Sequence, residues 1–142
     1  MRNVGLAADY VRRARIRLGA LDVLFKEESW PDVVRESQEI VELALKGLLR
    51  WCGVDPPRIH DVSDVLLAEK DRLPPEVARE ARALADSSRH LRRDRELAFY
   101  GAEDLTPTGF YSRADAVSAR DAARRTVEVV YPHVMEEVGE EG

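Results

Sequence analysis

Residues 30–53, WPDVVRESQEIVELALKGLLRWCG, decide the fold of this chain. Their apolar residues recur every three or four positions, which predicts a helix, and they occupy more than one stripe of its surface. Ser29 and Pro31 are typical of the start of such a helix, and Gly53 is typical of its end. A helix that is apolar on two sides must be covered on both, and we expect a second copy of the chain to supply part of that cover.

The rest of the sequence has the same helical periodicity, with no pattern typical of strands and no internal repeat. One apolar stripe predicts a first helix that ends near residues 26–28. Its members are Val4, Ala7, Ala8, Val11, Ala14, Leu18, Leu21 and Phe25. After the break at Pro56-Pro57, Asp61 can cap a short helix that continues through residues 62–67.

Two further long helices are predicted. Pro74 and Pro75 begin the first, and we expect its inward side to be formed by Val77, Ala81, Leu84, Ala85, Ser88 and Leu91. Ser112-Arg113-Ala114-Asp115 has the form of a capping box and begins the last helix. This helix can pack closely through Ala116, Ala119, Ala123, Val127, Val130 and Val134. The sequence therefore predicts an all-α fold, an up-and-down bundle of four long helices plus one short helix, in a single domain over residues 1–142.

The composition limits what this protein can be. With 142 residues, of which 44% are hydrophobic, the chain can bury one core but not two. No apolar run approaches the ~18 residues needed to cross a bilayer, so we expect a soluble, cytoplasmic protein that does not contact a membrane. Cys52 is the only cysteine and the three histidines are scattered, which argues against a disulfide or a metal site. Glycine-rich phosphate loops are also absent, and we expect no cofactor.

Charge is distributed unevenly along the chain. The formal net charge of -5 argues against a protein that coats nucleic acid over its whole surface. Residues 79–95, however, include six arginines and three acidic residues, and a second basic cluster occupies residues 12–17. Arginine binds phosphate through two parallel hydrogen bonds, so either cluster could hold a nucleotide or RNA. The alternative is that each cluster is a solvated face rich in arginine.

The segment at residues 88–101, SRHLRRDRELAFYG, resembles the signature helix of the HEPN domains. An arginine followed by a polar residue leads, after a helical turn, to a small residue, an aromatic residue and Tyr-Gly. Three further segments resemble the family in the same order along the chain: Ser37-Gln38 with residues 41–49, His60-Asp61 before a hydrophobic residue, and Tyr111 with Asp115-Ala116. The resemblance implies small all-α dimers in which an Arg-polar-x(4 to 6)-His motif, often extended to His-x-Tyr, forms a metal-independent ribonuclease site at the dimer cleft.

This chain departs from the family pattern at the histidine. Arg93 and Asp94 match the start of the motif, and Arg93 with Tyr100 would form the catalytic pair. In an alternative alignment, Arg95 and Tyr100 form Arg-x(4)-Tyr. When Tyr100 is aligned with the tyrosine of the motif, Ala98 stands in place of histidine and has no group that can take the proton of a 2'-hydroxyl. Tyrosine is a poor base at neutral pH. We therefore predict that efficient nuclease activity is lost. Whether the protein is an enzyme stays open at this point; if it is one, it is a metal-independent endoribonuclease.

The resemblance leads to a specific functional prediction. A homodimer would bring the arginine helices of two subunits to one cleft, which would bind nucleotide or RNA through Arg89, His90, Arg92, Arg93 and Asp94. The family further implies a nucleotidyltransferase-like protein as the antitoxin partner in a toxin-antitoxin type of pair. Two alternatives stay open: a metal-independent ribonuclease toxin that uses Arg93 with Tyr100 or His90, and a helical scaffold that binds no ligand.

Overall fold

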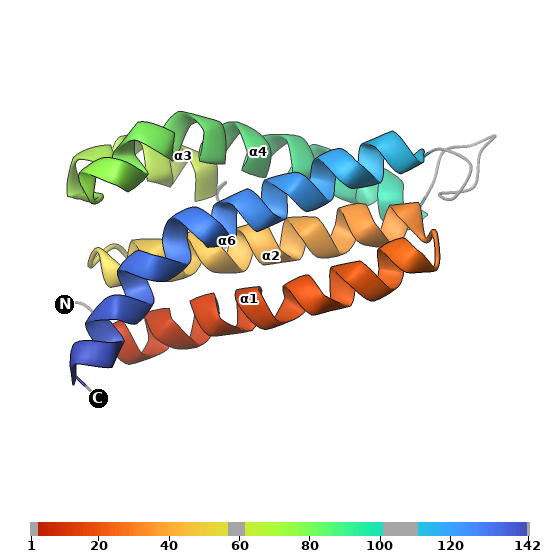
Figure 1. The fold of residues 1–142 in the computed structure, drawn as a ribbon. Coiled ribbons are helices and arrows are strands. Elements are labelled where there is room, and N and C mark those ends of the chain that lie inside the picture. Colours follow the sequence, from red (N-terminus) through yellow and green to blue (C-terminus); the bar gives the residue numbers. More distant parts are fainter. Residues whose placement is uncertain (1–2, 57–61, 101–110, 142) are drawn as a thin grey trace.

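The computed structural model describes residues 3–56, 62–100 and 111–141, and the side chains of these residues except those of 93–100 and 137–141. All regular structure in the described residues is helical, which confirms the predicted all-α fold. In chain order the elements are α1 (Val4–Lys26), α2 (Trp30–Trp51), α3 (Val62–Ala68), the 3-10 helix η1 (Lys70–Arg72), α4 (Pro75–Tyr100) and α6 (Arg113–Glu141). The long helices α1, α2, α4 and α6 run in alternating directions, as in an up-and-down bundle (Figure 1).

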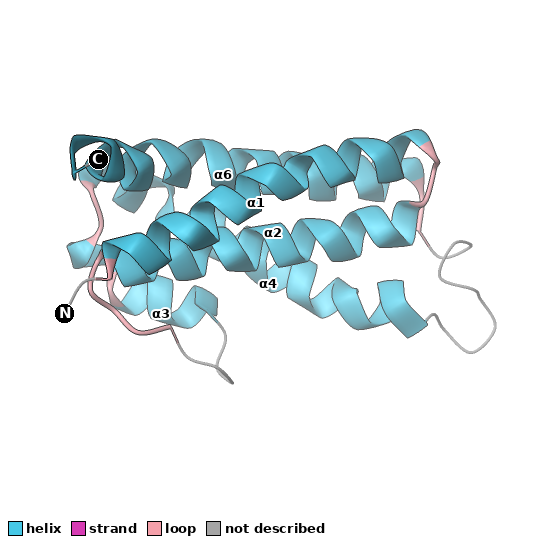
Figure 2. Ribbon diagram, turned by 90° about the horizontal axis from the view of Figure 1, so that it is seen from below, coloured by secondary structure: helices cyan, strands magenta, loops and turns pink. Residues whose placement is uncertain are grey.

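The helix α2 lies at the centre of the bundle and is covered from several sides (Figures 1 and 2). It packs against α1, α4 and α6, and it also contacts α3. Its buried residues are Pro31, Val33, Val34, Ser37, Gln38, Ile40, Val41, Ala44, Leu45, Gly47, Leu48 and Leu49. The expectation that a second copy helps to cover these apolar stripes is wrong, because helices of the same chain cover them.

The contact between α1 and α2 is close because one of its positions is a glycine. A Cβ atom at Gly47 would lie 2.7 Å from Val11 Cγ2 and 3.1 Å from the carbonyl oxygen of Ala7. Val11 and Ala7 are both completely buried. The absence of a side chain at Gly47 therefore lets the backbone of α1 approach α2 closely at this point.

The predicted helix ends are partly confirmed. Gly53 has a φ of 82° just after α2, a conformation that favours glycine. Before α6, the Asp115 amide donates to Ser112 Oγ at 3.2 Å and the Ser112 amide donates to Asp115 Oδ2 at 2.8 Å, which is the reciprocal pattern of a capping box. Ser29 precedes α2 as expected, but its hydroxyl donates to Asp32 Oδ2 at 2.5 Å and does not cap a backbone amide. The predicted cap at Asp61 lies outside the described residues.

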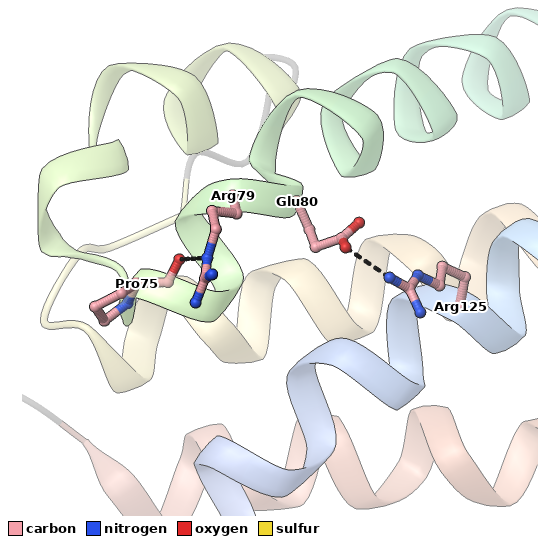
Figure 3. A network of polar contacts seen from close by, with 4 residues as sticks. All are labelled: Pro75, Arg79, Glu80 and Arg125. Atoms are coloured by element: carbon pink, nitrogen blue, oxygen red, sulfur yellow. Dashed lines mark hydrogen bonds and ion pairs between the residues drawn. The ribbon is translucent and has the colours of Figure 1, made fainter.

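The helices α4 and α6 bury the residues that their periodicity predicts. On α4 these are Val77, Ala81, Leu84, Ala85, Ser88 and Leu91, and on α6 they are Ala116, Ala119, Ala123, Val127, Val130 and Val134. An ion pair of 2.6 Å between Glu80 Oε1 and Arg125 Nη2 joins the two helices at the surface, and Arg79 Nε donates to the Pro75 carbonyl within α4 (Figure 3). None of the helices in the described residues combines the length and the hydropathy that a membrane span requires.

Candidate nucleic-acid interface

Two neighbouring residues of α4 reach different parts of the surface. Arg89 and His90 are both exposed, and consecutive residues of a helix point about 100° apart. Arg89 Nη2 forms an ion pair of 2.6 Å with Asp64 Oδ1 of α3, whereas His90 lines a cleft between α4 and α6. The structure therefore places Arg89 beside α3 and His90 beside α6, at two edges of the same helix.

The pair of Arg89 with Asp64 is open to solvent. The two side chains are 45% and 70% exposed. Ion pairs in this setting contribute about 0–1 kcal/mol, because water and salt screen both charges. The guanidinium of Arg89 can therefore exchange Asp64 for another anion at little cost. The sequence did not predict that Asp64 pairs with Arg89, because no sequence pattern shows which turn of α3 lies beside α4.

Arg92 is less accessible than its neighbours. The residue is half-buried and its Nη1 atom has almost no contact with solvent. At least this part of its guanidinium is therefore closed to a ligand from outside. Its long side chain contributes to packing at the surface of the bundle as well as to the charge of α4.

The cleft beside His90 has a volume of about 290 Å³ and lies between α2, α4 and α6. Apolar side chains and polar groups share its lining. The lining residues are Val34, Asp86, Ser87, His90, Leu91, Tyr111, Asp115, Ser118, Ala119 and Ala122. A cleft lined by apolar side chains and a few polar groups is the usual form of a small-molecule site.

The two carboxylates of the cleft differ in how they are engaged. Asp115 accepts hydrogen bonds from the amide and the hydroxyl of Ser112 and thereby holds the start of α6. Asp86 is exposed, and within the described residues no hydrogen bond or ion pair involves its carboxylate. Negative charge at this position disfavours a phosphate inside the cleft and favours a group that donates N–H or O–H bonds. The sequence did not indicate that Asp86 and Asp115 line the same cleft. The spacing of residues within α4 and within α6 does not show that the two helices face each other there.

The motif residues Arg93, Asp94 and Tyr100 lie in the second half of α4. Their side chains are outside the described residues, and only their positions on the helix can be stated. Positions 89, 93 and 100 are four and seven residues apart, so all three fall on one face of α4. The helix thus aligns Arg89 with the two residues of the expected catalytic pair.

The second basic cluster, in α1, is largely engaged within the chain. Arg17 Nε pairs with Glu36 Oε1 of α2 at 2.7 Å, Arg15 lies 4.5 Å above the ring centre of Tyr131, and Arg13 lies 3.9 Å from Asp9. These contacts neutralise or cover most of the cluster. They favour the interpretation of this region as a solvated face.

Metal binding finds no support in the described part of the chain. No group of three or more histidine, cysteine, aspartate or glutamate side chains comes together there in a way that could hold an ion. Cys52, just after α2, is half-buried and forms no disulfide within the described residues.

The bundle and its arginine-rich α4 define a helical domain of the type related to nucleotides and RNA. The family model of the HEPN domain matches residues 7–137, which is most of the chain, and the chain belongs to this family. The match includes all four segments that carry the sequence resemblance. No curated protein and no solved structure matches the chain.

Proposed function

We propose that this protein is a homodimer that binds nucleotide or RNA through α4. One observation carries the proposal: α4 places Arg89 on one face with positions 93 and 100, and places His90 in a cleft directly beside that face. Arginines along one face can bind successive phosphates, since each guanidinium offers parallel N–H donors. The neighbouring cleft is large enough, at about 290 Å³, for part of a nucleotide.

The two parts of the site suit different parts of the ligand. Phosphate is favoured beside Arg89, where an exposed ion pair with Asp64 is easily replaced. A base or a ribose is favoured in the cleft, because the Asp86 carboxylate and the Ser87 and Ser118 hydroxyls accept hydrogen bonds from such groups. His90 lies where an unpaired base can stack on its ring.

Binding without efficient cleavage is the activity that we propose. Ribonuclease chemistry needs a base for the 2'-hydroxyl, and Ala98 stands where the family motif has its histidine. Arg93 can stabilise negative charge on phosphate, but it does not supply the base that accepts the proton of the 2'-hydroxyl. A metal-independent ribonuclease that uses Tyr100 or His90 as its base is the alternative, and a cleavage assay separates the two.

The proposed partner is a nucleotidyltransferase-like antitoxin, as the family resemblance implies. In this arrangement the two α4 helices of a homodimer form one cleft, and the partner covers or modifies it. The assignment predicts a nucleotidyltransferase gene beside this one, and co-expression of the two proteins tests it. The expected result is a stable complex that no longer binds RNA, and the absence of such a complex would remove the toxin-antitoxin part of the proposal.

The binding proposal is tested by anisotropy of a labelled single-stranded RNA. Affinity should fall steeply between about 50 and about 200 mM salt, because phosphate contacts release counterions. Replacement of Arg92 and Arg93 by alanine should weaken binding by at least about tenfold. The matched control replaces Arg12 and Arg13 in α1, where we expect little change. Equal losses in the two variants, or binding that is insensitive to salt, would show that α4 is only a solvated face.

A further inference from the structure

The cleft between α4 and α6 is apolar where its lining is buried and polar where its lining is exposed. Leu91 and Ala119 are 2% and 4% exposed. Asp86, His90 and Ser118, which line the same cleft, are exposed residues. A flat ligand can therefore bury its apolar faces here while its polar edge meets hydrogen-bonding groups. Unstacked nucleic-acid bases have this form, and proteins bind them by stacking on the faces and hydrogen bonding to the edges.

The carboxylate of Asp86 gives the exposed part of this cleft negative charge. Two arginines of the same helices pair with other carboxylates. Arg89, three residues further along α4, pairs with Asp64 at 2.6 Å. Arg125 of α6 pairs with Glu80 at 2.6 Å (Figure 3). In the part of the chain that the structure describes, no ion pair or hydrogen bond engages Asp86, so its two oxygens can accept hydrogen bonds from a ligand.

We propose that this cleft selects guanine through Asp86. The inference rests on the proposed binding of nucleotide or RNA and names the base that is bound. An ionised carboxylate is an acceptor only, and its two oxygens can accept two parallel hydrogen bonds. The Watson–Crick edge of guanine carries two neighbouring donors, N1–H and the N2 amino group. One carboxylate can accept from both of these donors, in the manner of other bidentate contacts between side chains and bases.

The other three bases of RNA do not match a carboxylate. Adenine and cytosine each place an acceptor nitrogen beside their amino group, and uracil places its N3–H between two carbonyl oxygens. In each case an oxygen of Asp86 would face a lone pair. Guanine also carries an acceptor, O6, next to its two donors, and the hydroxyls of Ser87 and Ser118 can donate to it. The ring of His90 can stack on the base.

Fluorescence anisotropy of labelled RNA with the full chain tests the choice of base. The RNA is a single-stranded oligouridine with one central test nucleotide, which is guanosine, inosine or adenosine. Inosine differs from guanosine only by the loss of the N2 amino group, so it removes one of the two donors. We expect the guanosine RNA to bind about tenfold more tightly than the adenosine RNA, with the inosine RNA between them. An RNA with 7-deazaguanosine keeps both donors and should bind like the guanosine RNA.

Asp86→Asn tests whether this residue reads the base. The change keeps the size of the side chain and replaces one acceptor by an amide donor. A carboxamide matches adenine, whose amino group donates and whose N1 accepts. We expect the ratio of guanosine to adenosine affinity to fall by at least about tenfold. This ratio cancels any general gain in RNA affinity from the lost negative charge. Asp71→Asn, the same change at an exposed site on η1 outside the cleft, is the control and should leave the ratio unchanged.

The outcomes separate this inference from the proposed function. Equal affinities for the three RNAs, or a ratio that Asp86→Asn leaves unchanged, would overturn the guanine assignment while RNA binding stands. Titration calorimetry with guanosine and adenosine monophosphates identifies the source of the base. A guanine preference among free nucleotides supports a nucleotide ligand, and a preference confined to the oligonucleotides supports single-stranded RNA. Binding of neither RNA nor nucleotide would contradict the proposed function and the guanine assignment together.

Discussion

Replacing Gly47 by alanine measures how closely α1 and α2 pack. The new methyl group would lie 2.7 Å from Val11 Cγ2, 3.1 Å from the Ala7 carbonyl oxygen and 3.2 Å from Tyr10 Cβ. Val11 is buried and β-branched, so its side chain has no alternative rotamer to adopt easily. The Ala7 oxygen belongs to the backbone. Relief of the clash therefore requires the two helices to separate along part of their contact.

The expected magnitude follows from two opposing effects. Overpacking of a core costs about 1–3 kcal/mol, and the rigid neighbours of Gly47 place this site in the upper part of that range. The higher helix propensity of alanine offsets about 1 kcal/mol. We expect Gly47→Ala to lower the free energy of unfolding by about 1–2 kcal/mol, which is the difference of these values. In a chain of 142 residues this corresponds to a fall in Tm of about 3–7 °C.

Gly19→Ala is the matched control, because a Cβ atom at Gly19 meets nothing within 4 Å. Only the propensity effect acts there, and we expect a gain of about 0.5–1 kcal/mol. Urea unfolding followed by circular dichroism measures both variants. Each curve is recorded at two protein concentrations, so that any change in self-association appears as a shift of the midpoint. A Gly47→Ala protein as stable as the parent would refute this account of the α1–α2 contact.

Three further predictions concern the site and the surface. Ala98→His should create or raise cleavage of single-stranded RNA that is insensitive to chelators and abolished by Arg93→Ala; an inert variant would show that α4 lacks the family geometry. Ser112→Ala should lower stability by about 1 kcal/mol in urea unfolding, because the cap of α6 is lost, and an unchanged midpoint would contradict that role. Glu80→Gln should change stability by less than about 1 kcal/mol, since the pair with Arg125 is exposed; a larger loss by the same assay would mean that the pair fixes α4 against α6.

The sequence predicted the helices and their inward faces because these depend on neighbouring residues. Helical periodicity identified the buried sides of α4 and α6, and proline and glycine marked the ends of the helices. The capping box of Ser112 and Asp115 was also recognisable, since its hydrogen bonds span only three residues. The same local patterns supported the family resemblance that the match over residues 7–137 confirms.

Only the tertiary structure decided which surfaces meet. Periodicity showed that α2 is apolar on more than one side, but not that α1, α4 and α6 of the same chain cover it. The pairing of Arg89 with Asp64 and the cleft that His90 and Asp86 help to line depend on how α4 lies against α3 and α6. Such contacts join residues far apart in the chain, and their geometry is set by the positions at which side chains interlock between helices. A pattern within one helix carries no information about that geometry, so the sequence determined the helices and their packing determined the site.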